Sequence, residues 1–345
     1  MKPSIEPLYT VITTTNIQYG TGSLFKATEN ITSNIKTTTT VEMPLYLDIY
    51  EPADAPEGIR PVVMWMYGNG FVSLKSTRAG KFVPIAHQLA ARGYVVIAID
   101  YRTAYLNPIV SEQAQPYLNL VNHTNQEWVP LYFNGKPNHW PKLSEEQYKR
   151  AIAAAYDDGL TALKWIESEA ESRSLDMSRL VFMGSSSGST TGNSLAYLSD
   201  ELGIKTPKIA IMLSLWGSMD YSRFDGLTEI EDDEAPLFII HSLYDIAIRF
   251  ANASQMAARA KAIDLPHELI ELKPHPECVI DAPVGLHYDY IVLELDHPSE
   301  CATKALAEGE GHGLTEVPIL EAKATAKDNK TLFEHLVAFL DKNLP

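Results

Sequence analysis

Continuous apolar runs separated by glycine turns dominate the pattern of hydrophobic and polar positions along the chain. Two of these runs, PVVMWMY (61–67) and YVVIAIDYR (94–102), are typical of strands covered on both faces of a sheet. The segment between them, TRAGKFVPIAHQLAARG (77–93), is predicted to form a helix that ends at Gly93. Strand, glycine turn, helix and strand in this order predict a parallel sheet with crossover helices.

The alternation continues along the chain in both directions. Strands are predicted at RLVFMG (179–184), KIAIMLSL (208–215), APLFIIHS (235–242) and HELIELK (267–273). Helices are predicted at about 145–171, 187–201, 249–264 and 331–344. Residues 1–40 are rich in Thr and Asn and are expected to be strand or extended chain, with TTTT at 37–40 suited to a strand. LYLDIYEP (45–52) alternates and ends at a proline, as an outer strand would.

Two segments interrupt the alternation of predicted strands and helices. Residues 104–146 are polar and aromatic and contain five prolines, and residues 274–310 lie between the last predicted strand and the end of the chain. A loop as long as 104–146 is usually functional or disordered, and its aromatic content argues against disorder. We therefore expect one domain over 1–345, with insertions at about 104–146 and 274–310 that form a cap or pocket wall.

The charge balance makes several classes of partner improbable. The chain of 345 residues carries 44 acidic and 28 basic side chains, for a formal net charge of −16. Such a chain repels phosphate backbones and anionic lipid surfaces, so nucleic acid is not an expected partner. A transmembrane helix is not expected either, because the sequence has no apolar run of about 18 residues.

The two cysteines, Cys278 and Cys301, suit neither a zinc site nor a CxxC redox motif, and no metal is expected. They are either two free thiols or one disulfide that closes a loop. The N-terminal stretch MKPSIEPLYTVITTTNIQYG has no apolar core of signal-peptide length, so the chain is cytoplasmic or a mature exported form. Since a bridge would fit export, a secreted or periplasmic location is the favoured expectation.

The strongest chemical signal is Gly184-Ser185-Ser186-Ser187-Gly188, which has the pattern G-x-S-x-G between an apolar strand and a helix. A sharp strand-to-helix turn lifts a serine hydroxyl above the sheet, and its tight packing requires small flanking residues. The N–H groups of the new helix then face developing negative charge. A Ser/Gly string alone is more often a flexible loop, but this context selects Ser186, the middle serine, as a nucleophile.

A serine hydroxyl needs a base, and the expected chain order is serine, acid, histidine. Asp245 follows the strand ending in PLFII, at the sheet edge where a doubly wound fold gathers its site. Asp220, which follows the preceding strand, is the alternative acid. The plain alternative for either residue is a surface aspartate in a turn.

The predicted base is His312 in GEGHGL, where three glycines flank the imidazole and leave the backbone free to bring it into a cleft. Asp245 would then hold the tautomer of His312 and stabilise the imidazolium formed during the reaction. His312 could also be a solvent-loop histidine. The remaining candidates, His275, His287 and His297, lie in the second insertion.

A tetrahedral intermediate carries an oxyanion that needs preorganised donors. The backbone N–H of Ser187, directly after the nucleophile, is one predicted donor. The turn YGNGF after the strand at 61–67 supplies the others, and we expect them to be the N–H groups of Asn69 and Gly70. The alternative is an ordinary strand-to-helix turn.

Taken together, these segments resemble the carboxylesterase and lipase families of the α/β-hydrolase superfamily, and most closely bacterial carboxylesterases and hormone-sensitive-lipase-like esterases. The similar segments, in the family's order, are LYLDIYEP, YGNGF, GYVVIAIDYR, the helix with Asp157 and Asp158, RLVFMGSSSG, HSLYD and GHG. The resemblance implies an α/β-hydrolase fold, with a mostly parallel central sheet flanked by helices and two insertions near the active site.

The chain departs from the family pattern at three places. The family's HGGG turn reads YGNG here, so a histidine that usually braces the turn is missing and Asn69 stands where glycine is common. Ser187 occupies a position where alanine is frequent, which preserves the N–H donor. The 274–310 insertion separates the last strand from His312 by more than is usual and suggests a lid or pocket wall.

The resemblance and the candidate triad predict a serine carboxylesterase that acts through an acyl-enzyme on small aliphatic or aryl esters, including feruloyl or acetyl esters, and needs no cofactor. A serine peptidase or amidase on the same fold is the alternative, and a non-catalytic binding protein is a more remote one. Aromatic side chains in and near the insertion are candidates for the substrate pocket, with local packing as the plain alternative. These candidates are Phe71, Trp128, Tyr132, Trp140 and Trp216.

Overall fold

A computed structural model gives the fold of the chain. It describes residues 3–26, 39–72, 78, 80, 82–121, 132–133, 136–137, 143–219, 227–242, 245, 248, 250–272, 319–320 and 330–345. For 132–133 and 136–137 it describes the backbone alone.

Eight strands form one sheet in the spatial order β1-β2-β4-β3-β7-β8-β9-β10. The strands are β1 (Val11–Phe25), β2 (Thr40–Pro52), β3 (Arg60–Met66), β4 (Val95–Ile99), β7 (Leu175–Ser185), β8 (Ile211–Leu215), β9 (Leu237–Ser242) and β10 (His267–Leu272). β1 pairs antiparallel with β2 and β2 with β4, whereas the pairings from β4 to β10 are all parallel. A separate two-stranded sheet joins β5 (Tyr132–Phe133) to β6 (Lys136–Pro137).

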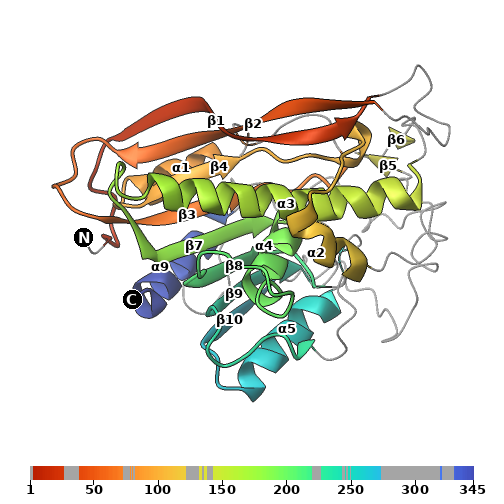
Figure 1. Ribbon diagram of the computed structural model, residues 1–345. Coiled ribbons are helices and arrows are strands. Elements are labelled where there is room, and N and C mark those ends of the chain that lie inside the picture. Colours follow the sequence, from red (N-terminus) through yellow and green to blue (C-terminus); the bar gives the residue numbers. More distant parts are fainter. Residues whose placement is uncertain are drawn as a thin grey trace.

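Helices cover both faces of the large sheet (Figure 1). α3 (Glu145–Glu169) and α4 (Ser187–Tyr197) lie over the front face in this view, with α2 (Gln115–Leu120) beside them. α1 (Val83–Ala90) and α9 (Leu332–Asn343) lie behind the sheet, and α5 (Phe250–Ala262) runs along β9 and β10. Two short 3-10 helices, η1 (Ala104–Leu106) and η2 (Glu112–Ala114), precede α2.

Local sequence explains why the longest helix begins where it does. Ser144 is the N-cap of α3, and its side chain accepts a hydrogen bond from the N–H of Gln147. The side chain of Gln147 in turn accepts a hydrogen bond from the N–H of Ser144. This capping box satisfies two N–H groups that the first turn leaves unpaired. The run Ala151–Ala155 behind it is buried, and four of its five side chains are those of alanine, which allow the helix to lie close to its neighbours.

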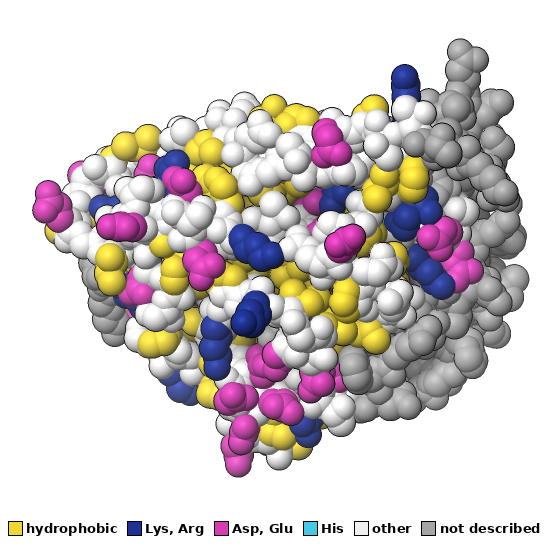
Figure 2. Space-filling model, in the orientation of Figure 1, with side chains coloured by type: hydrophobic (Ala, Val, Ile, Leu, Met, Phe, Trp, Pro, Cys, Tyr) yellow, Lys and Arg dark blue, Asp and Glu magenta, His cyan; other side chains and the backbone are white. Residues whose placement is uncertain are grey.

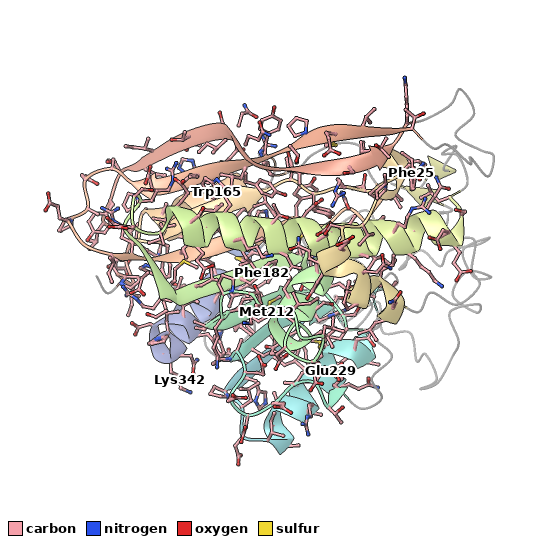
Figure 3. All side chains as sticks on the ribbon, viewed as in Figure 1. Phe25, Trp165, Phe182, Met212, Glu229 and Lys342 are labelled. Carbon is pink, nitrogen blue, oxygen red and sulfur yellow. The ribbon has the colours of Figure 1, made fainter. Side chains whose placement is uncertain are left out.

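The core lies between the sheet and these helices. Phe182 on β7 and Met212 on β8 are register partners, and both are buried at the centre of the molecule (Figure 3). Every residue of β3 after Arg60 is also buried. A strand buried on both faces is apolar without alternation, and this is the pattern on which the sequence prediction depended.

The structure confirms the predicted fold class and corrects some boundaries. The helix predicted at 77–93 begins at Val83, where Pro84 occupies the first turn and its fixed φ favours a helix start. The helix predicted at 187–201 ends at Tyr197. The segment 45–52 is a strand but not the outer one, because β1 pairs along its whole length.

Charged side chains of both signs are mixed over the face formed by α3, and acidic side chains gather at its lower end (Figure 2). Within the described part of the chain, no helix has the length and apolar character needed to cross a bilayer.

Candidate active site

Strained backbone gathers at the carboxyl edge of the sheet. Three residues with side chains lie in the left-handed region there, namely Phe71 (φ 62°), Ser186 (φ 49°) and Trp216 (φ 43°). They follow β3, β7 and β8, which are consecutive neighbours in the sheet. Each such residue costs of order 1–3 kcal/mol, and strain of this kind concentrates at functional sites. The backbone itself thus marks this edge as the candidate site.

Ser186 lies at the turn between β7 and α4, with φ 49° and ψ −123°. Its N–H donates to the carbonyl of Leu215 at 2.9 Å, and its own carbonyl accepts from the N–H of Thr190 at 2.9 Å. These two bonds tie the turn to β8 on one side and to the first turn of α4 on the other. The predicted strand-to-helix elbow is therefore present in the structure.

The two glycines of the motif allow this turn to form. A Cβ on Gly188 would lie 2.1 Å from the carbonyl oxygen of Met66, and one on Gly184 would lie 2.6 Å from backbone atoms of Gly188. Backbone therefore passes where any side chain would clash. The requirement for small residues, expected from the motif, has a steric basis here.

The turn after β3 packs directly against the elbow. A Cβ on Gly68 would lie 2.5 Å from the Cβ of Ser186, and the Gly68 N–H donates to Ser185 Oγ at 3.0 Å. The N–H of Asn69 donates to Ser187 Oγ at 2.9 Å. The two segments are thus joined by two hydrogen bonds, one to the residue before Ser186 and one to the residue after it.

The N–H groups predicted to bind an oxyanion differ in whether they already have a hydrogen-bond acceptor. Within the described structure, those of Gly70 and Ser187 have no hydrogen-bond acceptor, whereas that of Asn69 is engaged by Ser187 Oγ. Unpaired N–H groups at the start of a helix and in a tight turn are available to an anion. Gly70 and Ser187 therefore supply two available donors, and Asn69 could join them only if its bond to Ser187 opened.

The Tyr101 side chain, buried just after β4, reaches this turn. Its hydroxyl lies 2.8 Å from the carbonyl oxygen of Tyr67, 2.7 Å from Asn69 Oδ1 and 3.0 Å from Ser187 Oγ. Burial raises the pKa of Tyr101 well above its usual range, so the hydroxyl stays protonated and can donate.

Asp245 lies three positions beyond β9, and its side chain is enclosed. Its Oδ1 accepts from the N–H of Ile248 at 2.9 Å, and its Oδ2 lies 3.2 Å from Nε2 of His241. The same Nε2 lies 2.8 Å from the carbonyl oxygen of Ile248. Because both neighbours of Nε2 are acceptors, the tautomer with a proton on Nε2 satisfies them.

Several predicted residues lie outside the part of the chain that the structure describes. These are His312, Cys278, Cys301, Trp128 and Trp140, with the alternatives Asp220, His275, His287 and His297. Tyr132 belongs to β5, and its side chain is not described. Phe71 and Trp216 are both buried, and the ring of Phe71 meets that of Tyr148 on α3 edge-on at 6.2 Å.

Sequence reasoning missed three residues that act on this edge. Tyr101 braces the turn, His241 contacts Asp245, and Ser185 accepts from Gly68. The His241–Asp245 spacing within HSLYD was visible, but nothing in the sequence indicated that both side chains would be enclosed together. Tyr101 carried no signal beyond its position after a strand.

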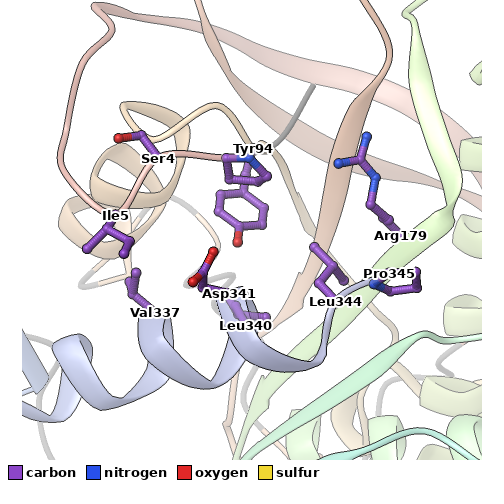
Figure 4. A pocket seen from close by; sticks show the side chains of 10 residues that line it. Ser4, Ile5, Tyr94, Arg179, Val337, Leu340, Asp341, Leu344 and Pro345 are labelled. Atoms are coloured by element: carbon purple, nitrogen blue, oxygen red, sulfur yellow. The ribbon is translucent and has the colours of Figure 1, made fainter.

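A cavity of about 270 Å³ lies elsewhere (Figure 4). Its wall includes Arg179 in the first half of β7, whereas Ser186 follows the end of that strand. It also includes Ser4 and Ile5 from the N-terminal segment and Leu344 from the C-terminal one. This cavity is therefore distinct from the candidate active site. Among the described side chains, no group of three or more His, Cys, Asp or Glu could hold a metal ion.

Two family models match the chain. One, BD-FAE, matches residues 47–115, and the other, described as alpha/beta hydrolase fold, matches residues 149–273. Together with the sheet order and the elbow, these matches confirm that the chain has the α/β-hydrolase fold. Among curated proteins, no sequence matches it significantly.

Solved structures of esterase 2 from the Planctomycetes species Thermogutta terrifontis are similar to it. The form phosphoramylated by tabun is 18% identical, with a TM-score of 0.48, over 79% of this chain and 92% of that one. The propionate-bound form is 17% identical, with a TM-score of 0.47, over 79% and 92%. The native form is 18% identical, with a TM-score of 0.46, over 84% and 91%.

Proposed function

We propose that this α/β hydrolase is a serine carboxylic-ester hydrolase with Ser186 as its nucleophile. The observation that carries the proposal is the backbone of Ser186, held at φ 49° between β7 and α4 and beside the N–H groups of Gly70 and Ser187, for which the described part of the chain supplies no acceptor. A strained serine next to free donors is what acyl transfer requires of a nucleophile and an oxyanion hole.

The reaction proceeds in two steps through an acyl-enzyme. Ser186 Oγ attacks the ester carbonyl while His312 takes its proton, and the oxyanion accepts from the N–H groups of Gly70 and Ser187. The alcohol leaves with the proton from His312. Water, deprotonated by the same imidazole, then attacks the acyl-enzyme and releases the acid. Asp245 stabilises the imidazolium in both steps.

The enclosure of Asp245 supports its part in this scheme. Its carboxylate accepts from the N–H of Ile248 and lies beside Nε2 of His241, so its orientation is fixed before any substrate binds. Both β7 and β9 end at the same edge of the sheet, with β8 between them. An imidazole between Ser186 and Asp245 would complete the relay, and His312 is the residue we assign to it.

The substrates we propose are small aliphatic or aryl esters, including acetyl and feruloyl esters. The aromatic-rich segment 104–146 and the insertion 274–310 would form the walls that select among these esters. Mass spectrometry before and after reduction tests whether Cys278 and Cys301 form a disulfide within the second insertion. Phe71 contributes through packing, because its ring is buried against Tyr148.

The central test compares Ser186→Ala with Ser199→Ala on a panel of p-nitrophenyl esters from acetate to octanoate, methyl ferulate and matched anilides. Ser199 is a buried serine after the end of α4 whose hydroxyl donates to Leu195 O, so its loss reports on folding alone. We expect Ser186→Ala to lose ester hydrolysis and fluorophosphonate labelling, and Ser199→Ala to keep both. Hydrolysis by Ser186→Ala at the wild-type rate would refute the proposal, and faster cleavage of the anilides would indicate an amidase.

A further inference from the structure

The turn Tyr67–Phe71 is held from the side by the segment that follows β4. The hydroxyl of Tyr101 contacts the beginning of the turn at Tyr67 O, and the N–H of Ala104 donates to Phe71 O at its end at 2.7 Å. Both ends of the turn are therefore held by hydrogen bonds from one neighbouring segment of the chain.

The hydrogen-bonding groups around Tyr101 form a closed set. The Asn69 N–H donates to Ser187 Oγ, and the Ser187 hydroxyl can donate to Tyr101 Oη, 3.0 Å away. The single Tyr101 proton is then shared between Tyr67 O and Asn69 Oδ1, while Asn69 Oδ1 also accepts from the N–H of Phe71 at 2.9 Å. Asn69 and Ser187, two departures from the family pattern, are thus bonded to each other.

The segment that carries Tyr101 is itself anchored by buried charges. The backbone N–H of Arg102 donates to Asp158 at 2.7 Å, and its guanidinium pairs with both Asp157 at 3.0 Å and Asp158 at 2.7 Å. The three side chains are almost fully enclosed. A buried ion pair contributes little net stability, but it fixes the positions of its partners.

The same cluster fastens a second point of the chain to α3. Asp157 also accepts from the N–H of Ser111 at 3.0 Å and from its hydroxyl at 2.6 Å. Burial alone lowers the pKa of Arg102, but the Asp158 and Asp157 carboxylates reverse this and raise it, so the guanidinium stays charged.

From these contacts we infer that Tyr101 is a positioning residue of the oxyanion hole, which holds Asn69, Gly70 and Ser187 at the distance the transition state requires. The buried Arg102–Asp157–Asp158 cluster acts through Tyr101 as its support. This inference rests on the proposed function, because it assumes that an oxyanion forms beside Ser186. It adds a residue that contacts no substrate and yet controls the rate of acyl transfer.

The test is Tyr101→Phe, with Tyr197→Phe as its matched control. The hydroxyl of Tyr197 is also fully buried and also donates to a backbone carbonyl, that of Ala235, at 2.8 Å. Ala235 lies just before the start of β9, so this bond is at the edge of the sheet opposite to the candidate site. Each variant loses one buried hydroxyl that donates to a backbone carbonyl. Only Tyr101→Phe removes a contact with the oxyanion turn.

We expect Tyr101→Phe to lower kcat on p-nitrophenyl acetate by about 10-fold or more, with KM within about 3-fold of the wild type, because the donors act only in the transition state. A trifluoromethyl ketone, which forms a tetrahedral adduct with the serine, should lose affinity by a similar factor. Tyr197→Phe should keep kcat and inhibitor affinity. Ser187→Ala combined with Tyr101→Phe should lose less than the product of the single losses, because both break one network.

The outcomes separate this inference from the proposed function. A wild-type protein without esterase activity, or an active Ser186→Ala, would overturn both. An active wild type with an inactive Ser186→Ala, together with a Tyr101→Phe that keeps kcat and inhibitor affinity, would overturn this inference alone. Equal losses of kcat in Tyr101→Phe and Tyr197→Phe would also overturn it, because they would reflect folding and not the position of the turn.

Discussion

Nε2 of His241 lies 3.2 Å from Oδ2 of Asp245, and both side chains are completely enclosed. Nε2 also lies 2.8 Å from Ile248 O. One N–H group of His241 therefore contacts both the Asp245 carboxylate and the backbone three residues after it. An enclosed carboxylate requires such donors, because an unpaired charge in a low-dielectric interior is costly. His241 thus supports the residue that we propose as the acid of the triad.

The first prediction follows from this contact. His241→Leu removes the donor beside Oδ2 of Asp245 and leaves the Ile248 N–H on Oδ1 as the contact that orients the carboxylate. We expect kcat for ester hydrolysis to fall by about 10-fold. The free energy of unfolding should fall by about 1–3 kcal/mol, because the Ile248 carbonyl also loses its partner. Steady-state kinetics and urea unfolding measure the two effects. His335→Leu is the control, because His335 also pairs with a carboxylate, Glu268 at 3.1 Å, but belongs to α9. A wild-type kcat in His241→Leu would contradict the prediction.

The second prediction concerns the elbow. A Cβ at Gly188 would lie 2.1 Å from Met66 O and 2.6 Å from Tyr67 O, so Gly188→Ala must push α4 away from the turn. We expect kcat to fall by about 100-fold or more, since displacements of about 1 Å have effects of that size. Gly203→Ala is the contrast, because Gly203 has φ 66° but nothing within 4 Å of its added Cβ. It should lose stability and keep kcat, and similar kcat values in the two variants would count against the steric argument.

Some of this site could be predicted because its signal is local. Ser186 is marked by its own neighbours, since a glycine two positions away on either side and an apolar strand before it define the turn. The apolar runs at 61–67 and 179–184 indicated buried strands directly, and the structure contains both. Burial on both faces leaves a pattern in the sequence that needs no knowledge of the rest of the fold.

Other contacts could not be predicted, because they join segments that are distant in the sequence. Tyr101 reaches Asn69 across 32 positions, and Asn69 reaches Ser187 across 118. Which strands are neighbours decides such contacts, and the order β4-β3-β7 is not encoded in any one segment. The start of α1 was missed for a different reason, because the prediction did not use Pro84, which lies in the first turn of the helix and is a local signal for a helix start.

The third prediction concerns the buried charge cluster. Arg102→Met leaves the Asp157 and Asp158 carboxylates enclosed without their cation, so the free energy of unfolding should fall by about 3–5 kcal/mol. Urea unfolding followed by circular dichroism would measure this loss. Arg173→Met breaks a pair with Glu169 that is about one-third exposed, and it should cost less than about 1 kcal/mol. Equal losses in the two variants would show that the enclosed cluster has no special weight.

The last prediction concerns pH. Burial, followed by the nearby Asp200 and Asp233 carboxylates, raises the pKa of Glu234 to about 7, although Lys208 opposes this shift. A carboxyl whose pKa is raised in the folded state stabilises the fold fully below its ordinary value of 4.5, and this contribution is lost as the pH rises through about 7. Folded protein should therefore become less stable between about pH 5 and pH 8 by an amount that depends on Glu234.

Glu234→Gln should reduce that loss, because the amide has no proton to release. Between pH 5 and pH 8 the free energy of unfolding should therefore fall less in the variant than in the wild type. After allowance for solvent screening, we expect the two falls to differ by on the order of 1 kcal/mol. Urea unfolding at both pH values measures this difference. Glu231→Gln removes the same charge from an exposed position in the same connection and should show no such gain. Parallel pH dependence in the wild type and Glu234→Gln would mean that another group controls stability in this range, since Glu234 would then be titrating equally in the folded and unfolded chain.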